Sequence, residues 1–281
     1  MDQRASNKNF LRHLVDGQVW WPTDQPPFDW AMSLMPNLRA TDPELRDTLT
    51  YEILTQLLMI RALTPNELAK LLDLATSQDY LFYRIGETNT DSVFARSFAA
   101  LVVAAVVEVD STDAHLSAIQ IKQAMDTVIA YARAERDYRG FVDGKGWAHS
   151  VAHAADALDS LAQHPRASSK QHTAILDTVA QLAGLGFPLV YGEDDRLAFV
   201  VLRLAQRGPS EIDWPKWLTA FRVASSGSVS DDLRAGNIGH FLRALHLMLH
   251  WELPRWPHTN VLLNQMREVH KFYRYGTLPL K

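Results

Sequence analysis

The sequence predicts an all-α protein, and three observations lead to this fold class. Apolar residues recur every three or four positions, which places them on one face of a helix, as in the series Leu45, Leu49, Ile53, Leu57 and Ile60. The alternation of apolar and polar residues that marks β-strands is hard to find along the chain. Helix-capping and helix-breaking residues occur at short intervals, so we expect many helices joined by short connections.

Individual helix starts carry chemical signals. Thr64-Pro65-Asn66-Glu67 offers a capping hydroxyl, a proline at the first helical position and a glutamate that reaches back to the cap, and Thr41-Asp42-Pro43-Glu44 repeats this arrangement. Together with the apolar spacing, such signals predict helices over residues 4–16, 27–37, 42–61, 65–76, 78–84, 92–108, 116–137, 147–162, 169–184, 194–207, 214–224, 232–252 and 259–274.

Short connections favour antiparallel packing of sequential helices. We expect residues 1–281 to form a single helical-repeat domain, an α-α superhelix of antiparallel helix hairpins similar to a HEAT solenoid, although the sequence shows no strict repeat. Prolines interrupt an aromatic loop that runs from Trp20-Trp21-Pro22 to Pro26-Pro27-Phe28. Residues 1–40 are therefore predicted to cap the N-terminal end of the stack.

Composition excludes several classes of function. Hydrophobic residues make up 47% of the 281 residues and charged residues 21%, which is enough for a full core and argues against long disorder. The net charge is −4 and the basic residues are scattered, so nucleic acid is not expected as a partner. The absence of cysteine excludes disulfides, thiolate metal sites and a cysteine nucleophile.

The sequence also predicts a protein outside the membrane. Met1-Asp2-Gln3-Arg4 begins no apolar signal segment. The longest apolar run, Phe98 to Val107, is about half the ~20 residues that a membrane helix needs. We interpret this run as a buried helix and expect a cytoplasmic protein with no membrane partner.

Ionisable residues concentrate between Arg136 and Asp156, where a helix end, a glycine-rich turn and a new helix meet. At about 100° per residue, His149, His153 and Asp156 fall on one stripe of the new helix. The opposite stripe is apolar and is expected to face the core; it consists of Ala148, Val151, Ala152, Ala155 and Leu158. The polar stripe is left facing a groove, a neighbouring helix or solvent.

Two interpretations of the polar stripe remain open. His149 and His153 lie one helical turn apart, a geometry that zinc or another divalent metal accepts, and Asp156 would be a third ligand. Alternatively, the imidazoles hydrogen-bond a carbonyl or carboxylate across a packed interface, which is the interpretation we favour. Peptidase chemistry is disfavoured, because Ser150 stands where zinc peptidases carry their glutamate.

The turn itself suggests a third possibility. Gly144-Lys145-Gly146 lies just ahead of a helix, whose first amides and dipole attract a phosphate or carboxylate. The spacing is not that of a nucleotide-binding loop and no strand is predicted before it, so the glycines are equally explained as turn residues.

Helix counting predicts neighbours for this segment. In an up-and-down stack alternate connections emerge on the same rim, so the turn at 138–146 should share a rim with the turns at 85–91 and 185–193. The ligand-binding candidates at this rim are Asp91, Arg96, Arg139, Lys145, Trp147, His149, His153, Asp156, Glu193 and Asp194, with Asp195 beside them. The alternative is that the carboxylates only complement helix dipoles.

Other candidates carry less information. His246 and His250 also lie four residues apart, but near a helix end where imidazoles commonly face the last carbonyls. The serines from Ser225 to Ser230 have no base beside them in sequence, so no serine nucleophile is assigned.

The run from Asp137 to Asp156 is long and unusual, and with it the chain resembles a bacterial family of uncharacterised proteins, defined by a domain of unknown function. Asp91-Ser92-Val93-Phe94-Ala95-Arg96-Ser97-Phe98 and Glu193-Asp194-Asp195-Arg196-Leu197-Ala198 extend the resemblance over most of the chain. The resemblance implies an all-helical, HEAT-like bacterial protein. It implies no activity, cofactor or catalytic residue.

The leading functional hypothesis is a binding protein that holds a small polar molecule or a protein segment at the rim. Arg139, Lys145, His149, His153 and Asp156 would make the contacts. One rival is a metal-dependent hydrolase, in which His149, His153 and a rim carboxylate bind a divalent ion that lowers the pKa of a water. The other is a pure protein-interaction scaffold. The sequence leaves open whether the protein is an enzyme.

Overall fold

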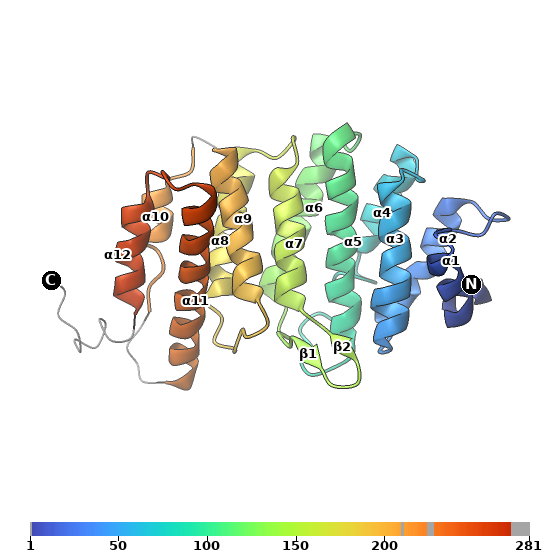
Figure 1. Ribbon diagram of the computed structural model, residues 1–281, viewed down its shortest axis with the longest axis horizontal. Coiled ribbons are helices and arrows are strands. Elements are labelled where there is room, and N and C mark those ends of the chain that lie inside the picture. Colours follow the sequence, from blue (N-terminus) through green and yellow to red (C-terminus); the bar gives the residue numbers. More distant parts are fainter. Residues whose placement is uncertain (1, 209–210, 224–227, 271–281) are drawn as a thin grey trace. The chain divides into compact units, whose positions relative to one another are not determined.

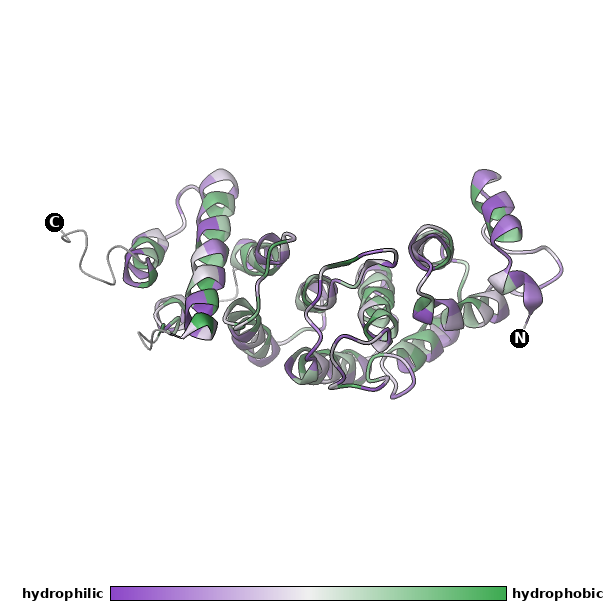
Figure 2. Cartoon of the chain, turned by 90° about the horizontal axis from the view of Figure 1, so that it is seen from below, coloured by the Kyte–Doolittle hydropathy of each residue, from purple (hydrophilic) through white to green (hydrophobic). Residues whose placement is uncertain are grey.

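The computed structural model describes residues 2–208, 211–223 and 228–270, and in these residues the fold is all-α as predicted (Figure 1). Twelve α-helices and a single pair of two-residue strands make up the regular structure of these residues, together with three short 3-10 or π segments, η1 to η3. Figure 2 shows hydrophobic and hydrophilic residues alternating along individual helices, as expected for helices that bury one side.

The chain forms two compact units, Met1–Ala167 and Ser168–Lys281. The predicted single domain with residues 1–40 as a cap, and its superhelical stacking, stay predictions. The elements of the first unit are η1 (Gln3–Ser6), α1 (Lys8–Asp16), α2 (Pro27–Leu34), η2 (Met35–Arg39), η3 (Glu44–Tyr51), α3 (Glu52–Met59), α4 (Pro65–Ala75), α5 (Ser92–Asp113), α6 (Ala118–Ala134), β1 (Phe141–Val142), β2 (Gly146–Trp147) and α7 (Ser150–Gln163).

Helix α5 is the central element of the first unit. It packs against α7, and also against α3, α4, α6 and η2. By length and composition α5 is apolar enough to cross a membrane, but 83% of its most apolar window is buried inside the protein. The predicted assignment of this run as a buried helix is therefore confirmed.

The capping signal at Thr64 acts as the sequence predicted, but the one at Thr41-Asp42-Pro43-Glu44 does not. There the Asp42 carboxylate accepts hydrogen bonds from the Glu44 and Leu45 amides, and the Glu44 side chain pairs with Arg12 and Lys8 instead of reaching back to a Thr41 cap. The Thr64 hydroxyl accepts a hydrogen bond from the Glu67 amide while the Glu67 side chain accepts one from the Thr64 amide, which closes a capping box at α4. Ser117 and Gln120 close the same motif at the start of α6. These caps satisfy helix amides that would otherwise lack partners.

Several predicted boundaries were wrong. Residues 78–84 form successive turns instead of a helix. The Arg39 guanidinium holds these turns, because it stacks over the rings of Tyr80 and Tyr83 and donates to the Asp79 carbonyl. The segment 214–224 is helical only over α10 (Trp214–Leu218), and residue 224 lies outside the described residues. The helix predicted over 259–274 ends at Val269, and residues 271–274 lie outside the described residues.

Two more differences concern the candidate site. Residues 44–51 are wound as a π-helix, η3, where the sequence predicted one continuous α-helix over 42–61. The helix predicted to begin at residue 147 begins at Ser150, because Gly146 and Trp147 pair with Phe141 and Val142 as strands.

The second unit contains α8 (Ser169–Ala183), α9 (Glu193–Arg207), α10, α11 (Val229–Glu252) and α12 (Thr259–Val269). Helix α9 packs against α8 and α11, and α12 packs against α10 and α11. An aromatic cluster forms part of its core, in which Trp217 lies edge-on to Phe221 and Phe241. The Trp217 indole nitrogen donates to the Leu176 carbonyl, so this buried polar atom is satisfied.

Candidate functional site

The segment between α6 and α7 is a tight β-hairpin. Phe141 lies opposite Trp147 and Val142 opposite Gly146 in antiparallel register. The Lys145 amide donates to the Val142 carbonyl at 3.0 Å and closes the turn. Gly144 and Gly146 have φ angles of +69° and +77°, which glycine adopts at little cost. The glycines of Gly144-Lys145-Gly146 are therefore turn residues of the hairpin.

The hairpin is fixed to the start of α5. The Lys145 Nζ atom lies 2.6 Å and 2.8 Å from the two carboxylate oxygens of Asp91. The Arg139 Nη2 atom donates to the Thr90 carbonyl at 2.6 Å and also pairs with Asp137. The turns at 85–91 and 138–146 thus lie together, as helix counting predicted. Both cations are occupied by these internal contacts.

The turn at 185–193 belongs to the second unit, so its predicted place at the same rim stays a prediction. Within that unit, Glu193 is buried and its carboxylate accepts a hydrogen bond from the Tyr191 amide at 2.8 Å. Asp194 is half-buried and Asp195 exposed, and both lie in the first turn of α9. There they complement the positive end of the helix dipole. Partial desolvation and the neighbouring Asp194 carboxylate raise the pKa of Asp195.

Arg96 holds the base of the hairpin together from inside the protein. Its fully buried guanidinium makes a two-point ion pair with Glu135 at the end of α6, with distances of 2.6 Å and 2.9 Å. Its Nη1 atom donates to the Tyr83 carbonyl and the Ser92 hydroxyl. All its polar groups face protein atoms, so the geometry assigns this predicted ligand-binding residue a structural role.

Sequence reasoning missed Arg46, which supports the hairpin from the other side. The buried Arg46 guanidinium lies 4.1 Å and 4.8 Å from the ring centroids of Phe94 and Phe98, in cation-π contact with both. It donates to the Lys145 carbonyl at 2.8 Å and pairs with the neighbouring Asp47. Burial lowers the pKa of Arg46 and raises the pKa of Asp47. No spacing signal in the sequence marks this arginine as buried.

A row of rings in contact with one another runs from the core to the hairpin. Phe98 lies edge-on to His153 at 5.1 Å between centroids, and His153 lies 5.8 Å from His149. The His149 ring stacks on Trp147 at 4.3 Å with an interplanar angle of 25°. Trp147 in turn lies edge-on to Phe141 at 5.0 Å. The row links the protein interior to rings at its surface.

The outer end of this row is open to solvent. Phe141 is 48% exposed and Trp147 40% exposed. Asp143, between them in the hairpin, is also exposed. We call Phe141, Asp143 and Trp147, with the His149 ring stacked on Trp147, the hairpin surface. Large aromatic rings held at a surface by a rigid support are characteristic of binding sites.

The backbone at His149 is strained. Its φ and ψ angles of 47° and 36° lie in the left-handed region, which a residue with a side chain rarely adopts. Hydrogen bonds from the Ala148 amide to the Gly140 carbonyl and from the His149 amide to the Arg139 carbonyl hold it there. This turn points the imidazole at Trp147, and such strain is often found at functional positions.

The predicted polar stripe of α7 differs in detail from the structure. His149 precedes the helix, so only His153 and Asp156 are helical. Helix α7 is buried on nearly all sides; His153 is 9% exposed and packs on α5, while Asp156 is half-buried. His153 therefore faces a neighbouring helix, one of the three surroundings that the sequence allowed.

The predicted metal site at His149, His153 and Asp156 stays a prediction. In the part of the chain that the structure describes, no three His, Asp or Glu side chains come together in a group able to hold a metal ion. A divalent metal needs three or more protein ligands at most sites. The observed contacts of the two imidazoles are with aromatic rings, His149 with Trp147 and His153 with Phe98.

Comparison with known proteins identifies the family. By its fold, the described part of the chain is an all-α protein with a single β-hairpin. The family model described as "Protein of unknown function (DUF2785)" matches residues 81–247. The chain therefore belongs to this family. The matched segment contains α5, the hairpin and α7 to α9. Curated proteins and solved structures gave no match.

Proposed function

We propose that this protein binds a segment of a partner protein at the hairpin surface. The observation that carries the proposal is the exposure of Phe141 and Trp147, 48% and 40%, on a hairpin fixed at both its base and its turn. A rigid support lowers the entropy that is lost on binding. Exposed aromatic rings supply most of the binding energy at many interfaces.

The chemistry of the hairpin surface favours a partner segment with a basic residue beside apolar ones. Lys145 and Arg139 are occupied by Asp91 and Asp137, so neither cation is left to attract an acidic partner. The Asp143 carboxylate is exposed at the turn. Aromatic rings attract cations as well as apolar groups, and a nearby carboxylate strengthens this preference.

Three further expectations from the sequence, on helix arrangement, origin and location, are part of the same proposal. We infer a HEAT-like arrangement of helix pairs, a bacterial origin and a cytoplasmic location. The family resemblance supports the first two. The burial of α5, the one helix of the described residues that is both long and apolar enough to cross a membrane, is compatible with the third.

The metal-dependent hydrolase is not favoured by a specific observation. Its two imidazoles are engaged in ring contacts, His149 with Trp147 and His153 with Phe98. The scaffold hypothesis is kept in a more specific form, in which the partner protein binds at the hairpin surface.

A peptide library displayed on phage tests the proposal. Peptides selected on the full-length protein should be enriched in Arg or Lys next to apolar residues, and Trp147→Ala should weaken their binding about tenfold or more. Phe199→Ala is the matched control, because Phe199 is a 44% exposed aromatic residue on α9. No enrichment, or equal losses of affinity in Trp147→Ala and Phe199→Ala, would refute the proposal.

A further inference from the structure

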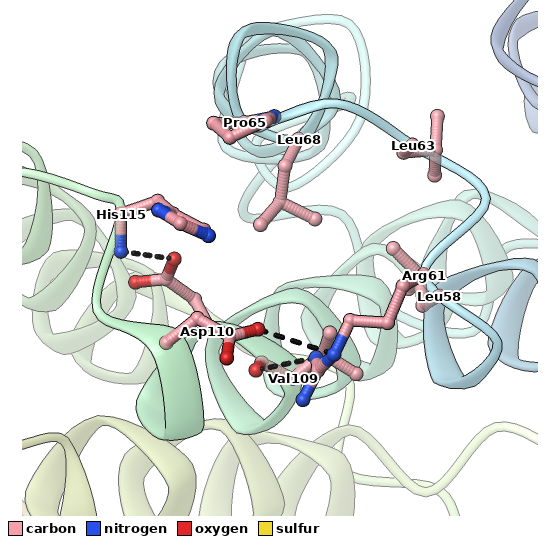
Figure 3. Close-up of a pocket in the computed structure, with 9 residues that line it drawn as sticks. Leu58, Arg61, Leu63, Pro65, Leu68, Val109, Asp110 and His115 are labelled. Carbon is pink, nitrogen blue, oxygen red and sulfur yellow. Dashed lines mark hydrogen bonds and ion pairs between the residues drawn. The ribbon is translucent and has the colours of Figure 1, made fainter.

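A cavity in the first unit lies at the opposite end of α5 from the hairpin surface. Its volume is about 140 Å³, and it lies between α3, α4 and the last turn of α5 (Figure 3). Helix α5 has 22 residues, so about 33 Å separate its two ends. The proposed peptide binding does not involve this cavity, which therefore needs its own explanation.

Most of the cavity wall is apolar. Leu58 and Leu68 are 1% and 6% exposed and reach it from α3 and α4. Figure 3 shows the Leu68 side chain pointing into the space between His115 and Arg61. An apolar cavity of about 150 Å³ holds a benzene molecule. The cavity is thus large enough for an apolar group of that size.

A fixed carboxylate lies behind the cavity wall, because Asp110 belongs to the lining but its side chain is fully buried. Asp110 is 1% exposed and accepts hydrogen bonds from the His115 and Leu116 amides at 2.9 Å and 3.1 Å. Its second oxygen lies 3.0 Å from the His164 Nε2 atom. His164 Nδ1 accepts a hydrogen bond from the Arg166 amide, so this imidazole carries its hydrogen on Nε2 and is neutral. The Asp110 charge is therefore surrounded by neutral donors.

The other two charged side chains of the lining, Arg61 and Asp113, neutralise each other. Arg61 pairs with Asp113, Nε to Oδ2, at 3.1 Å and donates to the Val109 carbonyl at 2.9 Å. The lining therefore holds two carboxylates against one guanidinium, with His115 exposed at its edge. The negative end of the α5 dipole lies at the same place. A positive charge is favoured in this cavity, and a negative one is disfavoured.

We propose that this cavity binds an organic cation, consisting of an ammonium group on an apolar body of about the size of benzene. The ammonium would lie beside the accessible Asp113 carboxylate, with the buried Asp110 charge behind the wall, and the apolar body would pack against Leu58, Leu63 and Leu68. A free amine and the lysine side chain of a protein share this chemistry.

Three probes of the same size test the proposal on the full-length protein: benzylamine, benzyl alcohol and benzoate. Titration followed by ligand-observed NMR should show binding of benzylamine, about fivefold weaker binding of benzyl alcohol and no binding of benzoate. Acetyl-lysine methylamide, with its free side-chain ammonium, is the second cation. If it binds more tightly than benzylamine, the ligand is a protein lysine; if it binds more weakly, the ligand is a free amine.

Two variants test whether benzylamine binds inside the cavity. Leu63→Phe should fill it and abolish binding of benzylamine, and Asp113→Asn should weaken binding about fivefold because a carboxylate is lost. Asp126→Asn is the matched control, since Asp126 is an exposed carboxylate on α6 away from the cavity. Equal binding of benzylamine and benzyl alcohol, no binding of either cation, or undiminished binding to both folded cavity variants would overturn the proposal.

Discussion

At the scale of single residues, buried charges decide what the candidate site can do. Arg96 and Glu135 are 0% and 3% exposed and satisfy each other with two hydrogen bonds. Such a pair contributes little net stability relative to apolar residues, but losing one partner leaves an uncompensated buried charge. The pair therefore fixes the hairpin base and is not available to a ligand.

The first prediction follows from this pair. Arg96→Met should lower the free energy of unfolding by about 3–5 kcal/mol, measured by urea denaturation, because Glu135 is left buried without its counter-charge. Lys122→Met breaks an exposed pair with Asp126 on α6 and should cost no more than about 1 kcal/mol. A loss as small in Arg96→Met as in Lys122→Met would contradict the structural role.

A second prediction concerns pH. Hydrogen bonds from Arg12 and Lys8 lower the pKa of Glu44 to about 2, from an ordinary value of 4.5. A carboxyl with a lowered pKa in the folded state contributes stability above its unfolded pKa, and this contribution is lost as the pH falls toward the folded value. The destabilisation by Glu44→Gln, measured as the shift in urea midpoint, should therefore be constant above about pH 5.5 and shrink as the pH falls below 4.5.

Arg12→Gln breaks the same contact between α1 and η3 and provides the check. Its midpoint shift should follow the same pH trend as that of Glu44→Gln. Opposite or flat trends in the two variants would rule out this ion pair as the cause.

At the scale of elements, local signals account for what the sequence could and could not predict. The start of α4 was predictable because the Thr64–Glu67 capping box is made by residues three positions apart. The hairpin was not, because two-residue strands show no alternation, and its positive-φ glycines also fit an ordinary turn. The π-helix η3 has no sequence signature of its own.

The hairpin yields the third prediction. A Cβ atom on Gly146 would lie 2.8 Å from the Pro43 Cβ, whereas one on Gly144 would meet nothing within 4 Å. Both positions carry a positive φ, so Gly144→Ala reports the backbone strain alone, about 1–2 kcal/mol. Gly146→Ala should cost at least about 1 kcal/mol more in urea denaturation, because the hairpin must move away from η3. Equal costs would show that the hairpin does not pack against Pro43.

At the scale of the whole molecule, the first unit contains a polar network of its own. In the first unit, both partners of the Arg96–Glu135 pair, of the Asp110–His164 contact and of the Lys145–Asp91 pair lie within Met1–Ala167. Partners such as Glu135 for Arg96 lie 39 residues apart, and sequence spacing does not reveal contacts at that range. Helix counting did bring Asp91 to Lys145, because rim connections alternate in a helix stack.

The fourth prediction is that residues 1–167 fold without the second unit. The fragment should show a helical circular dichroism spectrum and a single cooperative urea transition. Gly146→Ala should destabilise it by the same amount as it does the full chain. A fragment without cooperative unfolding would show that the first unit depends on residues 168–281.

Hydrogen–deuterium exchange tests most directly whether a partner segment binds at the hairpin surface. The experiment compares the full-length protein with and without a peptide selected on it. Binding at the hairpin surface should slow exchange of the amides in residues 139–149, where ordered contacts form on binding. The same peptide should leave the exchange of these amides unchanged in the Phe141→Ala, Trp147→Ala double variant. Protection elsewhere in the chain, with the hairpin amides unaffected in the wild-type protein, would contradict the account.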